Sequence, residues 1–348
     1  MSRMADEINE QPAVLERCLR DGASEIRAAV ELIRRTGPEL IVVAARGSSA
    51  YAGTFFRSLV ETHLGIPVVR AAPVVRTAYD RSVAWSRAVM VAISQSGGSP
   101  DTLAVVSDAV AAGIPTIAIV NDLDSPLAGT VDAVVPCRAG PEAITATKSY
   151  TSEVALLAAI VAGWTGSDEL RLGLARAPES VAGALEAGKS WLQTGAGADL
   201  IAALAKSDRG IVVSRGHNLA TAREVALKIT ETGGVFTAGL SAADFLHGQV
   251  VLATPGVPLL AFRPDGPAGA SVDRALEGAA PYGAPQWVVG GREVGARPDA
   301  LVLADELPEA LTPLTFVVPG QLAAERAARA RGRDPDMPDG LVKVIRTY

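Results

Sequence analysis

The chain has 348 residues and a mass of 35.7 kDa, about twice the length of one typical domain, so two domains are expected. Hydrophobic residues make up 49% and charged residues 20%, and the net charge is −6, which excludes a disordered chain and a basic nucleic-acid-binding surface. The longest uncharged apolar run has 11 residues, against the roughly 20 that a bilayer needs, and the polar, acidic N-terminus is not a secretory signal, so we expect a soluble cytoplasmic protein.

From the N-terminus onward, the predicted elements form an internal repeat. A helical segment, residues 1–37, precedes short β-branched runs that alternate with Ala- and Leu-rich helices, which is the pattern of a parallel sheet covered on both faces. Four of the runs recur at an offset of 169 positions: 41–46 with 211–215, 91–94 with 260–263, 117–120 with 286–289, and 132–135 with 301–304. The sequence therefore predicts an α/β protein built from two copies of one doubly wound domain.

The repeat also sets the predicted domain boundaries. The first copy is expected at residues 38–165 and the second at 208–330, joined by a helical connector at 166–207. Residues 331–348 form a C-terminal tail outside both copies. Ligands of open parallel sheets bind beyond the carboxyl ends of the strands, so the strand-end loops are the places to look for a site.

The strand-end loop at residues 94–102 predicts a phosphate site that needs no metal. Ser99 suits the N-cap of the next helix and Pro100 its first turn, so the loop leads into a helix N-terminus, which favours an anion. Its glycines allow close approach, and three serines with Thr102 supply hydroxyl donors. An ordinary Ser/Gly turn would look the same, but a second hydroxyl-rich loop, Gly47-Ser48-Ser49, follows the preceding strand and favours the phosphate interpretation.

Glu224, Lys228 and Glu231 fall on one narrow face of the helix that follows the first strand of the second copy. Such a face is most often a solvated row of ion pairs. The apolar flanks and the position after a strand-end loop favour the alternative, a carboxylate beside a lysine inside a pocket, which is how a proton-transferring base is built. His247 and Lys343 are by default a structural histidine and an exposed tail lysine.

These segments together resemble the SIS (sugar isomerase) family, specifically double-SIS proteins related to the isomerase half of glucosamine-6-phosphate synthase. The matching motifs span nearly the whole chain in family order: INEQP, ARGSS, ISQSGGSPDT, GPEAITATKSYT, SRGHNLATAREVALKITE, AADFLHGQ and DPDMPDGLVKV. Several of them are closer to the stand-alone amino-sugar-phosphate deaminases of this fold. The resemblance implies two tandem SIS domains, each a doubly wound parallel sheet flanked by helices.

The resemblance also implies a role for each matching residue. Glu231 matches the base that moves a proton between C1 and C2, with Glu224 and Lys228 beside the sugar. His247 matches the ring-opening acid/base, which in the family reaches in from a partner subunit, so a homodimer is expected. Lys343 matches the tail lysine that closes over the site and, in the synthase, forms a Schiff base with the ketose. The candidate phosphate-binding residues are Ser48, Ser49, Ser94, Gln95, Ser96 and Ser99.

The sequence departs from the synthase pattern in several places. No glutaminase domain is expected, and neither Cys18 nor Cys137 matches its N-terminal nucleophile, so the chain is not expected to draw ammonia from glutamine on its own. Gly98 stands where the synthase has Glu, and Asp339-Gly340 replaces Arg plus a polar residue in the tail. The segment 142–148 is one residue shorter, which bears on the sugar contacts expected of its threonines.

We therefore predict an enzyme, an isomerising deaminase that converts glucosamine 6-phosphate to fructose 6-phosphate and ammonia. His247 opens the ring, Glu231 transfers the proton, and the C2 imine hydrolyses, with exchange onto Lys343 as one route. No metal ion and no organic cofactor are expected, because metal-ligand spacings, a P-loop and a strand-linked GxGxxG are all missing. The expected partners are a sugar phosphate and a second copy of the chain, with neither nucleic acid nor membrane.

Three alternative functions remain open from the sequence. An aldose–ketose isomerase and a fructosamine-phosphate deglycase use the same fold and site, and ammonia release assayed over glucosamine, galactosamine and fructosamine phosphates separates them from the deaminase. A non-catalytic sugar-phosphate sensor would bind the sugar without converting it. The sequence does not determine which epimer is used or which direction the reaction takes.

Overall fold

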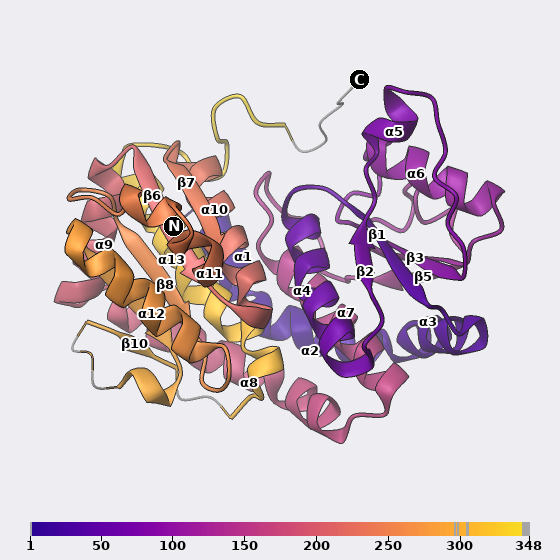
Figure 1. Ribbon diagram of the computed structural model, residues 1–348, viewed down its shortest axis with the longest axis horizontal. Coiled ribbons are helices and arrows are strands. Elements are labelled where there is room, and N and C mark those ends of the chain that lie inside the picture. The colour runs from indigo at the N-terminus through magenta and orange to yellow at the C-terminus, as the bar shows by residue number, and fades with distance from the viewer. Residues whose placement is uncertain (1, 296, 298, 304–305, 343–348) are drawn as a thin grey trace. The chain divides into compact units, whose positions relative to one another are not determined.

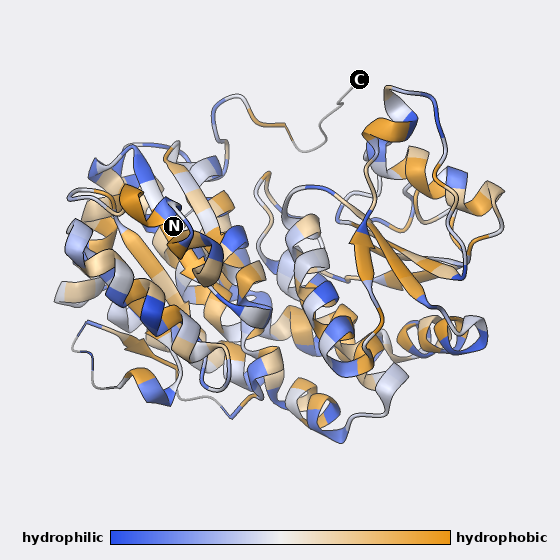
Figure 2. Cartoon of the chain, viewed as in Figure 1, coloured by the Kyte–Doolittle hydropathy of each residue, from blue (hydrophilic) through white to orange (hydrophobic). Residues whose placement is uncertain are grey.

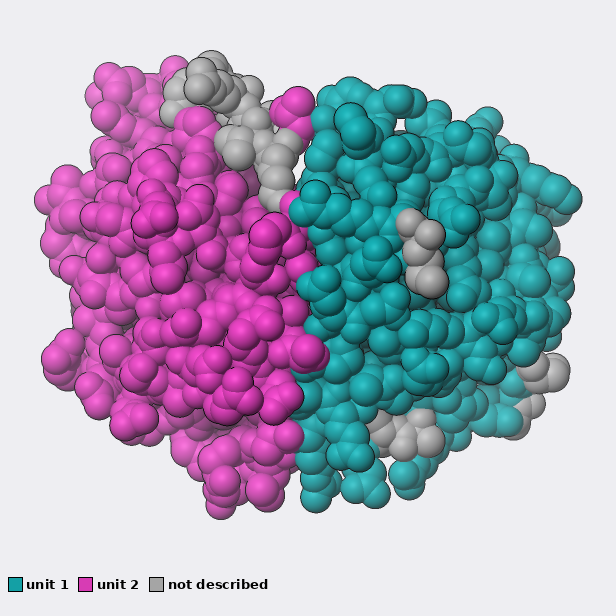
Figure 3. Space-filling view, turned by 180° about the vertical axis from the view of Figure 1, so that it is seen from behind, with its two compact units in different colours: residues 1–12, 143–147, 176–341 teal, residues 13–142, 148–175, 342–348 magenta. Residues whose placement is uncertain are grey.

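The computed structural model describes residues 2–295, 297, 299–303 and 306–342, and their elements are drawn in Figure 1. The chain divides into two compact units, coloured separately in Figure 3. Unit 1 contains the described parts of residues 1–12, 143–147 and 176–341, and unit 2 those of 13–142, 148–175 and 342–348. The domain boundaries taken from the repeat stay a prediction.

Unit 2 contains the first copy of the repeat, a five-stranded parallel sheet with the order β2-β1-β3-β4-β5. Ala45 lies opposite Ile93, so β1 and β3 end at the same edge of the sheet. The strands are β1 (Leu40–Ala45), β2 (Val68–Arg70), β3 (Ala88–Ser94), β4 (Thr116–Val120) and β5 (Ala133–Pro136). The helices are α2 (Gln11–Asp21), α3 (Ala23–Thr36), α4 (Gly47–Leu64), α5 (Val74–Thr77), α6 (Pro100–Ala111), α7 (Lys148–Thr165) and the first part of α8 (Asp168–Trp191).

Helices cover both faces of this sheet, which is why its strands are hydrophobic along their length (Figure 2). On one face, Val106 and Ala109 of α6 pack against Val42, Met90 and Ala118 of three neighbouring strands. The opposite side is covered by α3, α4 and α7. The long apolar run of the sequence lies in α7, where it is almost entirely buried. Across the described residues, we find no helix with both the length and the apolar character that crossing a bilayer requires.

Unit 1 contains the second copy, a parallel sheet with the order β10-β9-β8-β6-β7. Its strands are β6 (Arg209–Ser214), β7 (Phe236–Ser241), β8 (Leu259–Arg263), β9 (Gln286–Gly290) and β10 (Leu301–Val302). Its α-helices are α1 (Arg3–Asn9), the rest of α8, α9 (Gly195–Lys206), α10 (Leu219–Gly233), α11 (Ala242–Leu246), α12 (Gly269–Ala279) and α13 (Pro313–Ala330). Short 3₁₀ turns lie at Gly216–Asn218, Gln249–Leu252, Ala280–Tyr282, Arg292–Val294 and Glu309–Leu311.

The two sheets have the same strand order when each is numbered from its own first strand. In both, the second strand lies at one edge beside the first, and the third to fifth strands follow on the other side. This order confirms the predicted pair of doubly wound α/β domains. The strand order reverses between β1 and β3 and again between β6 and β8, and such switch points are where open α/β sheets bind ligands.

One strand in each copy was not predicted from the sequence. Val68–Arg70 has only three residues, too few to show a pattern, and Phe236–Ser241 contains a glycine and is only partly buried. Both are held by pairing to the first strand of their sheet rather than by their own composition. Residues 143–147 also differ from the prediction, because they lie within the sequence of the first copy and yet belong to unit 1.

Candidate functional site

Two serine-rich loops meet at the switch point of the sheet in unit 2. One follows β1 and opens α4, and it carries Ser48 and Ser49, both buried. The other follows β3, begins at Ser94 and leads into α6, whose N-cap is Ser99 and whose first residue is Pro100. The predicted cap and first turn are therefore confirmed. Because β1 and β3 are paired neighbours, the two loops lie at the same edge of one sheet.

Internal hydrogen bonds orient the hydroxyls of the second loop. The Gly97 N–H donates to Ser94 Oγ at 3.2 Å, the Gly98 N–H donates to Ser96 Oγ at 3.4 Å, and the Thr102 hydroxyl donates to Ser99 Oγ at 3.4 Å. In each case the serine oxygen accepts, which leaves its hydrogen to donate to an anion. In the first loop, Ser49 instead donates to the buried carboxylate of Glu153 at 2.8 Å. The two loops therefore differ. The loop after β3 can donate hydroxyl hydrogens to a ligand, whereas the Ser49 hydroxyl of the loop after β1 already donates to Glu153.

Gly97 is required by the shape of the second loop. Its φ of +59° lies in the left-handed region, and a Cβ atom at this position would collide with the Ser125 side chain. Gly98 has no such constraint, because a Cβ there would meet nothing nearer than the Ser96 atoms at 3.9 Å. The loop backbone is thus fixed at Gly97, and the position where the synthase has Glu can hold a side chain without a clash.

An ion pair that was not predicted from the sequence lies at the base of these loops. Asp101, in the first turn of α6, is buried, and the half-exposed Arg46 at the end of β1 meets its carboxylate through both Nε, at 3.1 Å, and Nη2. A buried carboxylate at this point would repel a phosphate, so the guanidinium balances the charge of the cradle. The available signal was a cationic residue directly before Gly47, but its partner lies 55 positions away in the sequence.

The predicted carboxylate–lysine face is on α10 in unit 1, and it is buried. Lys228 Nζ lies 3.5 Å from Glu224 Oε1 and 2.5 Å from Glu231 Oε2. The side chains of Glu224 and Lys228 are 0% and 1% exposed, whereas that of Glu231 is 24% exposed. A solvated row of surface ion pairs is therefore excluded. Of the three groups, Glu231 is the one that a molecule from solvent can reach.

The face is buried because α13 packs closely on α10. Gly320 of α13 faces Val225 of α10, and a Cβ atom at Gly320 would collide with the valine side chain. One turn further along α13, the carbonyl of Ala324 accepts a hydrogen bond from Thr232 at 3.5 Å. This close approach removes Glu224 and Lys228 from water, and their pairing offsets the cost of burying two charges.

The other predicted site residues are the catalytic candidates His247 and Lys343 and the phosphate-binding candidate Gln95. His247 is the C-cap residue of α11 and is exposed, and three exposed apolar side chains lie near it in sequence, Leu246, Val251 and Leu252. No hydrogen bond or ion pair among the described residues joins His247 to the α10 cluster. Lys343 lies outside the described residues. The half-buried Gln95 lies in the second serine loop of unit 2.

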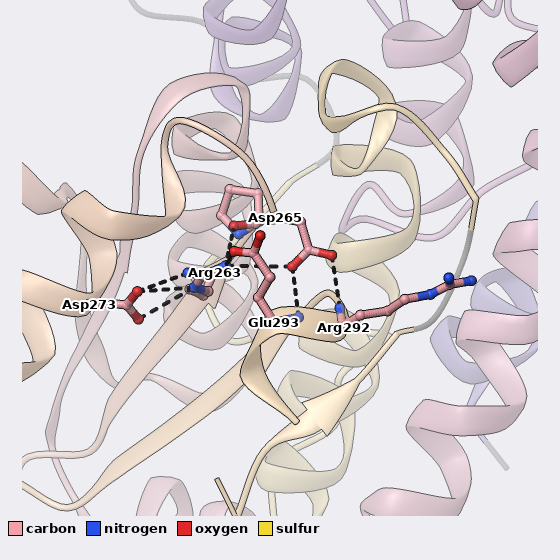
Figure 4. Close-up of polar contacts among 6 residues, drawn as sticks. Arg263, Asp265, Asp273, Arg292 and Glu293 are labelled. Carbon is pink, nitrogen blue, oxygen red and sulfur yellow. Dashed lines mark hydrogen bonds and ion pairs between the residues drawn. The ribbon is translucent and has the colours of Figure 1, made fainter. Parts of the chain in front are cut away.

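At the equivalent edge of the sheet in unit 1, charged side chains contact one another around the loop that follows β8 (Figure 4). Arg263, at the end of β8, contacts the carboxylates of Asp273 at 2.9 Å, Asp265 at 3.5 Å, and Glu293. Asp265 in turn accepts the backbone N–H groups of Arg292, at 2.9 Å, and Glu293, at 3.1 Å. The described loop at residues 263–269 contains no serine or threonine, and the Arg263 guanidinium at its start is surrounded by carboxylates.

Within the described part of the chain, no group of three or more His, Cys, Asp or Glu side chains has an arrangement that could hold a metal ion. The two cysteines are buried, and burial raises the pKa of the Cys18 thiol to about 12 and that of Cys137 well above its usual range. Such thiols are poor nucleophiles. Neither cysteine is therefore a candidate nucleophile.

Comparisons with known proteins agree with this architecture. The family model of the SIS domain matches residues 37–163. Glutamine–fructose-6-phosphate aminotransferase [isomerizing] from Thermococcus kodakarensis is 31% identical over 355 residues, which covers 98% of this chain but 57% of the relative. The chain thus spans little more than half the length of such curated relatives.

Solved structures extend the match over both sheets. A candidate phosphosugar isomerase from Silicibacter pomeroyi is 32% identical, with a TM-score of 0.85 over 97% of this chain and 100% of that one. Glucosamine-6-phosphate deaminase from Thermotoga maritima shares the fold at 19% identity, with a TM-score of 0.75 over 99% of each chain. The two sheets have the same strand order, and the chain is similar to the Silicibacter pomeroyi protein over its full length. The chain therefore belongs to the SIS-domain family, as a member with two SIS-like domains in tandem.

Proposed function

We propose that the chain is a sugar-phosphate isomerase that deaminates its substrate, converting glucosamine 6-phosphate to fructose 6-phosphate and ammonia. One observation carries this proposal: Glu231 is the reachable end of an otherwise buried Glu224–Lys228–Glu231 cluster. A carboxylate fixed by a buried lysine and open on one side has the arrangement of a general base. The relative from Thermococcus kodakarensis, named an isomerizing aminotransferase, supports a substrate that carries both an amino group and a phosphate.

The proposed reaction moves a proton from C2 to C1 and consumes one water molecule. After His247 has promoted ring opening to the C1 aldehyde, the Glu231 carboxylate removes the hydrogen from C2. The electron pair forms the C1–C2 double bond, and the C1 carbonyl oxygen takes up a proton, which gives the enolamine. Glu231 then returns its proton to C1 while the amine nitrogen gives up one proton, which leaves a C1 alcohol and a C2 imine. Water adds to C2, and the C–N bond breaks to release ammonia and the C2 ketone. The step is redox-neutral over the two carbons and uses no cofactor.

The serine loops of unit 2 take the phosphate in this proposal. Ser94, Ser96 and Ser99 each accept an internal hydrogen bond and can donate their own hydrogen to a phosphate oxygen. The N-terminus of α6 adds a positive dipole end, and Arg46 balances the Asp101 carboxylate. Binding energy from a group remote from C1 and C2 can orient those reacting carbons.

The proposal includes a homodimer in which His247 serves the site of the partner copy. His247 is exposed, and the exposed apolar side chains of Leu246, Val251 and Leu252 near it would be covered by a second chain. A complementation experiment tests the shared site: Glu231→Gln and His247→Ala homodimers are mixed and allowed to exchange subunits. Because half of a random mixture is heterodimer with one intact site, we expect about a quarter of wild-type activity. An inactive mixture, with exchange shown by mass spectrometry, contradicts the shared site.

The central experiment measures ammonia and ketose release from glucosamine, galactosamine and fructosamine 6-phosphates. The wild-type chain is expected to release both products from a 2-amino sugar. Glu231→Gln should lower kcat by about a thousandfold, the size of a lost general base, while the affinity for fructose 6-phosphate stays within about threefold. Glu277→Gln, an exposed carboxylate on α12, is the matched control and should retain wild-type kcat.

The products separate the other functions of this fold. A ketose without ammonia identifies an aldose–ketose isomerase, and ammonia from the fructosamine phosphate alone identifies a deglycase. Tight binding of every sugar phosphate without conversion identifies a sensor. Full activity of Glu231→Gln contradicts the proposed base whichever substrate is used.

A further inference from the structure

The N-terminal helix α1 is fixed at its start by residues from the far end of the chain, all within unit 1. The Asp336 carboxylate accepts the Arg3 N–H and the Met4 N–H, each at 2.7 Å, which caps two backbone donors of the first turn. Ser2, the N-cap residue, accepts from the Ala5 N–H at 3.1 Å and donates its hydroxyl to Glu325 of α13 at 2.6 Å. The position of α1 is therefore determined by contacts more than 300 residues away in sequence.

One turn into α1, Glu7 holds the segment of residues 143–147. Glu7 is 2% exposed, and its Oε1 accepts the Ala143 N–H at 2.7 Å and Arg3 Nε at 2.9 Å. The bond to Ala143 fixes the first residue of a segment that lies within the sequence of the first copy but belongs to unit 1. A buried carboxylate that accepts a backbone N–H contributes more than a neutral hydrogen bond and leaves that donor unsatisfied when it is removed.

The other end of the segment is tied to α13. Gln321, fully buried, donates to the Thr147 carbonyl at 3.5 Å and accepts from Gln11 Nε2 at 2.8 Å. Gln321 directly follows Gly320, the residue at which α13 contacts α10. The same stretch of α13 therefore supports both the segment and the helix that carries Glu231.

The segment of residues 143–147 contains one buried hydroxyl, that of Thr145, for which the described residues provide no hydrogen-bond partner. Thr145 is 1% exposed, and among the described residues its Oγ1 has no hydrogen-bond partner. A buried hydroxyl without a partner costs free energy, so a segment fixed at both ends around such a group is prepared for a polar ligand. The hydroxyl groups of a sugar have this chemistry.

We infer that Glu7 is a positioning residue for the sugar: it does not touch the reacting atoms but holds residues 143–147 in the conformation that binds the sugar hydroxyls. This inference rests on the proposed function, because it takes the ligand of unit 1 to be the sugar of the sugar phosphate. It assigns to the N-terminal helix a part in substrate affinity, with α1 acting through the backbone of Ala143.

The test compares Glu7→Ala and Glu7→Gln with Asp6→Asn, a carboxylate of the same helix that is exposed. The first readout is amide hydrogen exchange of the peptide covering 143–147, which does not depend on activity. The second is the split between KM and kcat for the amino-sugar phosphate. Glu7→Ala should speed exchange and raise KM by about tenfold or more, the size of one lost charged hydrogen bond, with kcat within about threefold.

Glu7→Gln keeps the shape and one acceptor oxygen, so it should give an intermediate effect, and Asp6→Asn should match wild type. Wild-type exchange in Glu7→Ala, or faster exchange with an unchanged KM, overturns the inference. If the wild-type chain converts none of the sugar phosphates, the proposed function has failed, and the Kd of fructose 6-phosphate then replaces KM. A tenfold rise of that Kd in Glu7→Ala supports the positioning role, and an unchanged Kd overturns it.

Discussion

In unit 2, the loop that follows the third strand of the sheet offers hydroxyl groups, whereas in unit 1 the equivalent loop is filled by charges of the chain itself. Ser94 and Arg263 occupy corresponding positions, 169 residues apart. Ser94 accepts one backbone hydrogen bond, while the Arg263 guanidinium contacts the carboxylates of Asp273 and Glu293 (Figure 4). Glu309 lies against the loop before α12, where it accepts the Ala268 N–H.

The difference shows that a repeated fold does not imply a repeated site. In both copies a helix starts beyond the third strand and provides backbone N–H groups. In unit 1 a carboxylate already lies beside the start of that helix, so an incoming phosphate would meet negative charge. In unit 2 the buried carboxylate in the first turn of that helix, Asp101, is balanced by Arg46. We therefore expect the loops, not the sheets, to decide where an anion binds.

Removal of the hydroxyls of unit 2 should have the strongest effect on phosphate binding. The double variant Ser94→Ala, Ser96→Ala should weaken fructose 6-phosphate binding by about a hundredfold, because it loses two hydrogen bonds to a charged group. Isothermal calorimetry measures the Kd. Ser271→Ala, on α12 of unit 1, is the matched control and should leave the Kd unchanged. Equal affinities of wild type and the double variant would place the phosphate elsewhere.

A second variant tests the charge balance of the same edge. Arg46→Ala leaves the buried Asp101 carboxylate without its guanidinium, and the Kd of fructose 6-phosphate should rise by about tenfold through repulsion of the phosphate. Adding Asp101→Asn should restore most of the affinity, because the repelling charge is gone. If Asp101→Asn restores nothing, Arg46 does not act by balancing that carboxylate.

The corresponding change in unit 1 should affect stability and not affinity. Arg263→Met leaves the Asp265, Asp273 and Glu293 carboxylates close together, so the free energy of unfolding should fall by about 1–3 kcal/mol. Urea denaturation measures the loss, which should shrink at acidic pH as the carboxylates become protonated. Unaltered stability at neutral pH would show that the cluster is only a surface arrangement, and a weaker sugar phosphate Kd would show that unit 1 also binds the anion.

The smallest expected effect concerns Glu309, whose pKa burial raises above the ordinary value of 4.5. The folded protein then holds this proton more tightly than the unfolded chain does. The resulting stabilisation is present below pH 4.5 and is lost as the pH rises through the higher pKa of the folded state. Glu309→Gln should therefore show a shallower fall of Tm with rising pH, measured by calorimetry against wild type. Parallel Tm curves for the two proteins would contradict the shift.

The sequence predicted most of the sheets because their signals are local. The β-branched runs and the 169-residue repeat identified four strands in each copy, and Ser99 with Pro100 correctly marked the start of α6. The edge strands β2 and β7 were missed because their pairing, not their composition, holds them in the sheet.

The site was predictable only in part, for the same reason. The spacing of Glu224, Lys228 and Glu231 placed them on one face, but only the contact of α13 with Val225 decides that this face is buried. The Arg46–Asp101 pair was missed because its members are far apart in sequence. A pattern within one helix is visible in the sequence, and its surroundings are not.

The cap that Asp336 places on α1 has a consequence for the order in which the protein is completed during synthesis. Unit 1 needs residues 1–12 together with Asp336, so its first segment must wait while more than 300 further residues emerge from the ribosome. The sheet of unit 2 is complete by Pro136 and can form while translation continues. Before Asp336 has been synthesised, α1 exposes the apolar side chains of Met4 and Ile8, which are buried in the complete protein. We therefore expect chaperones to retain nascent chains that are stalled before residue 336.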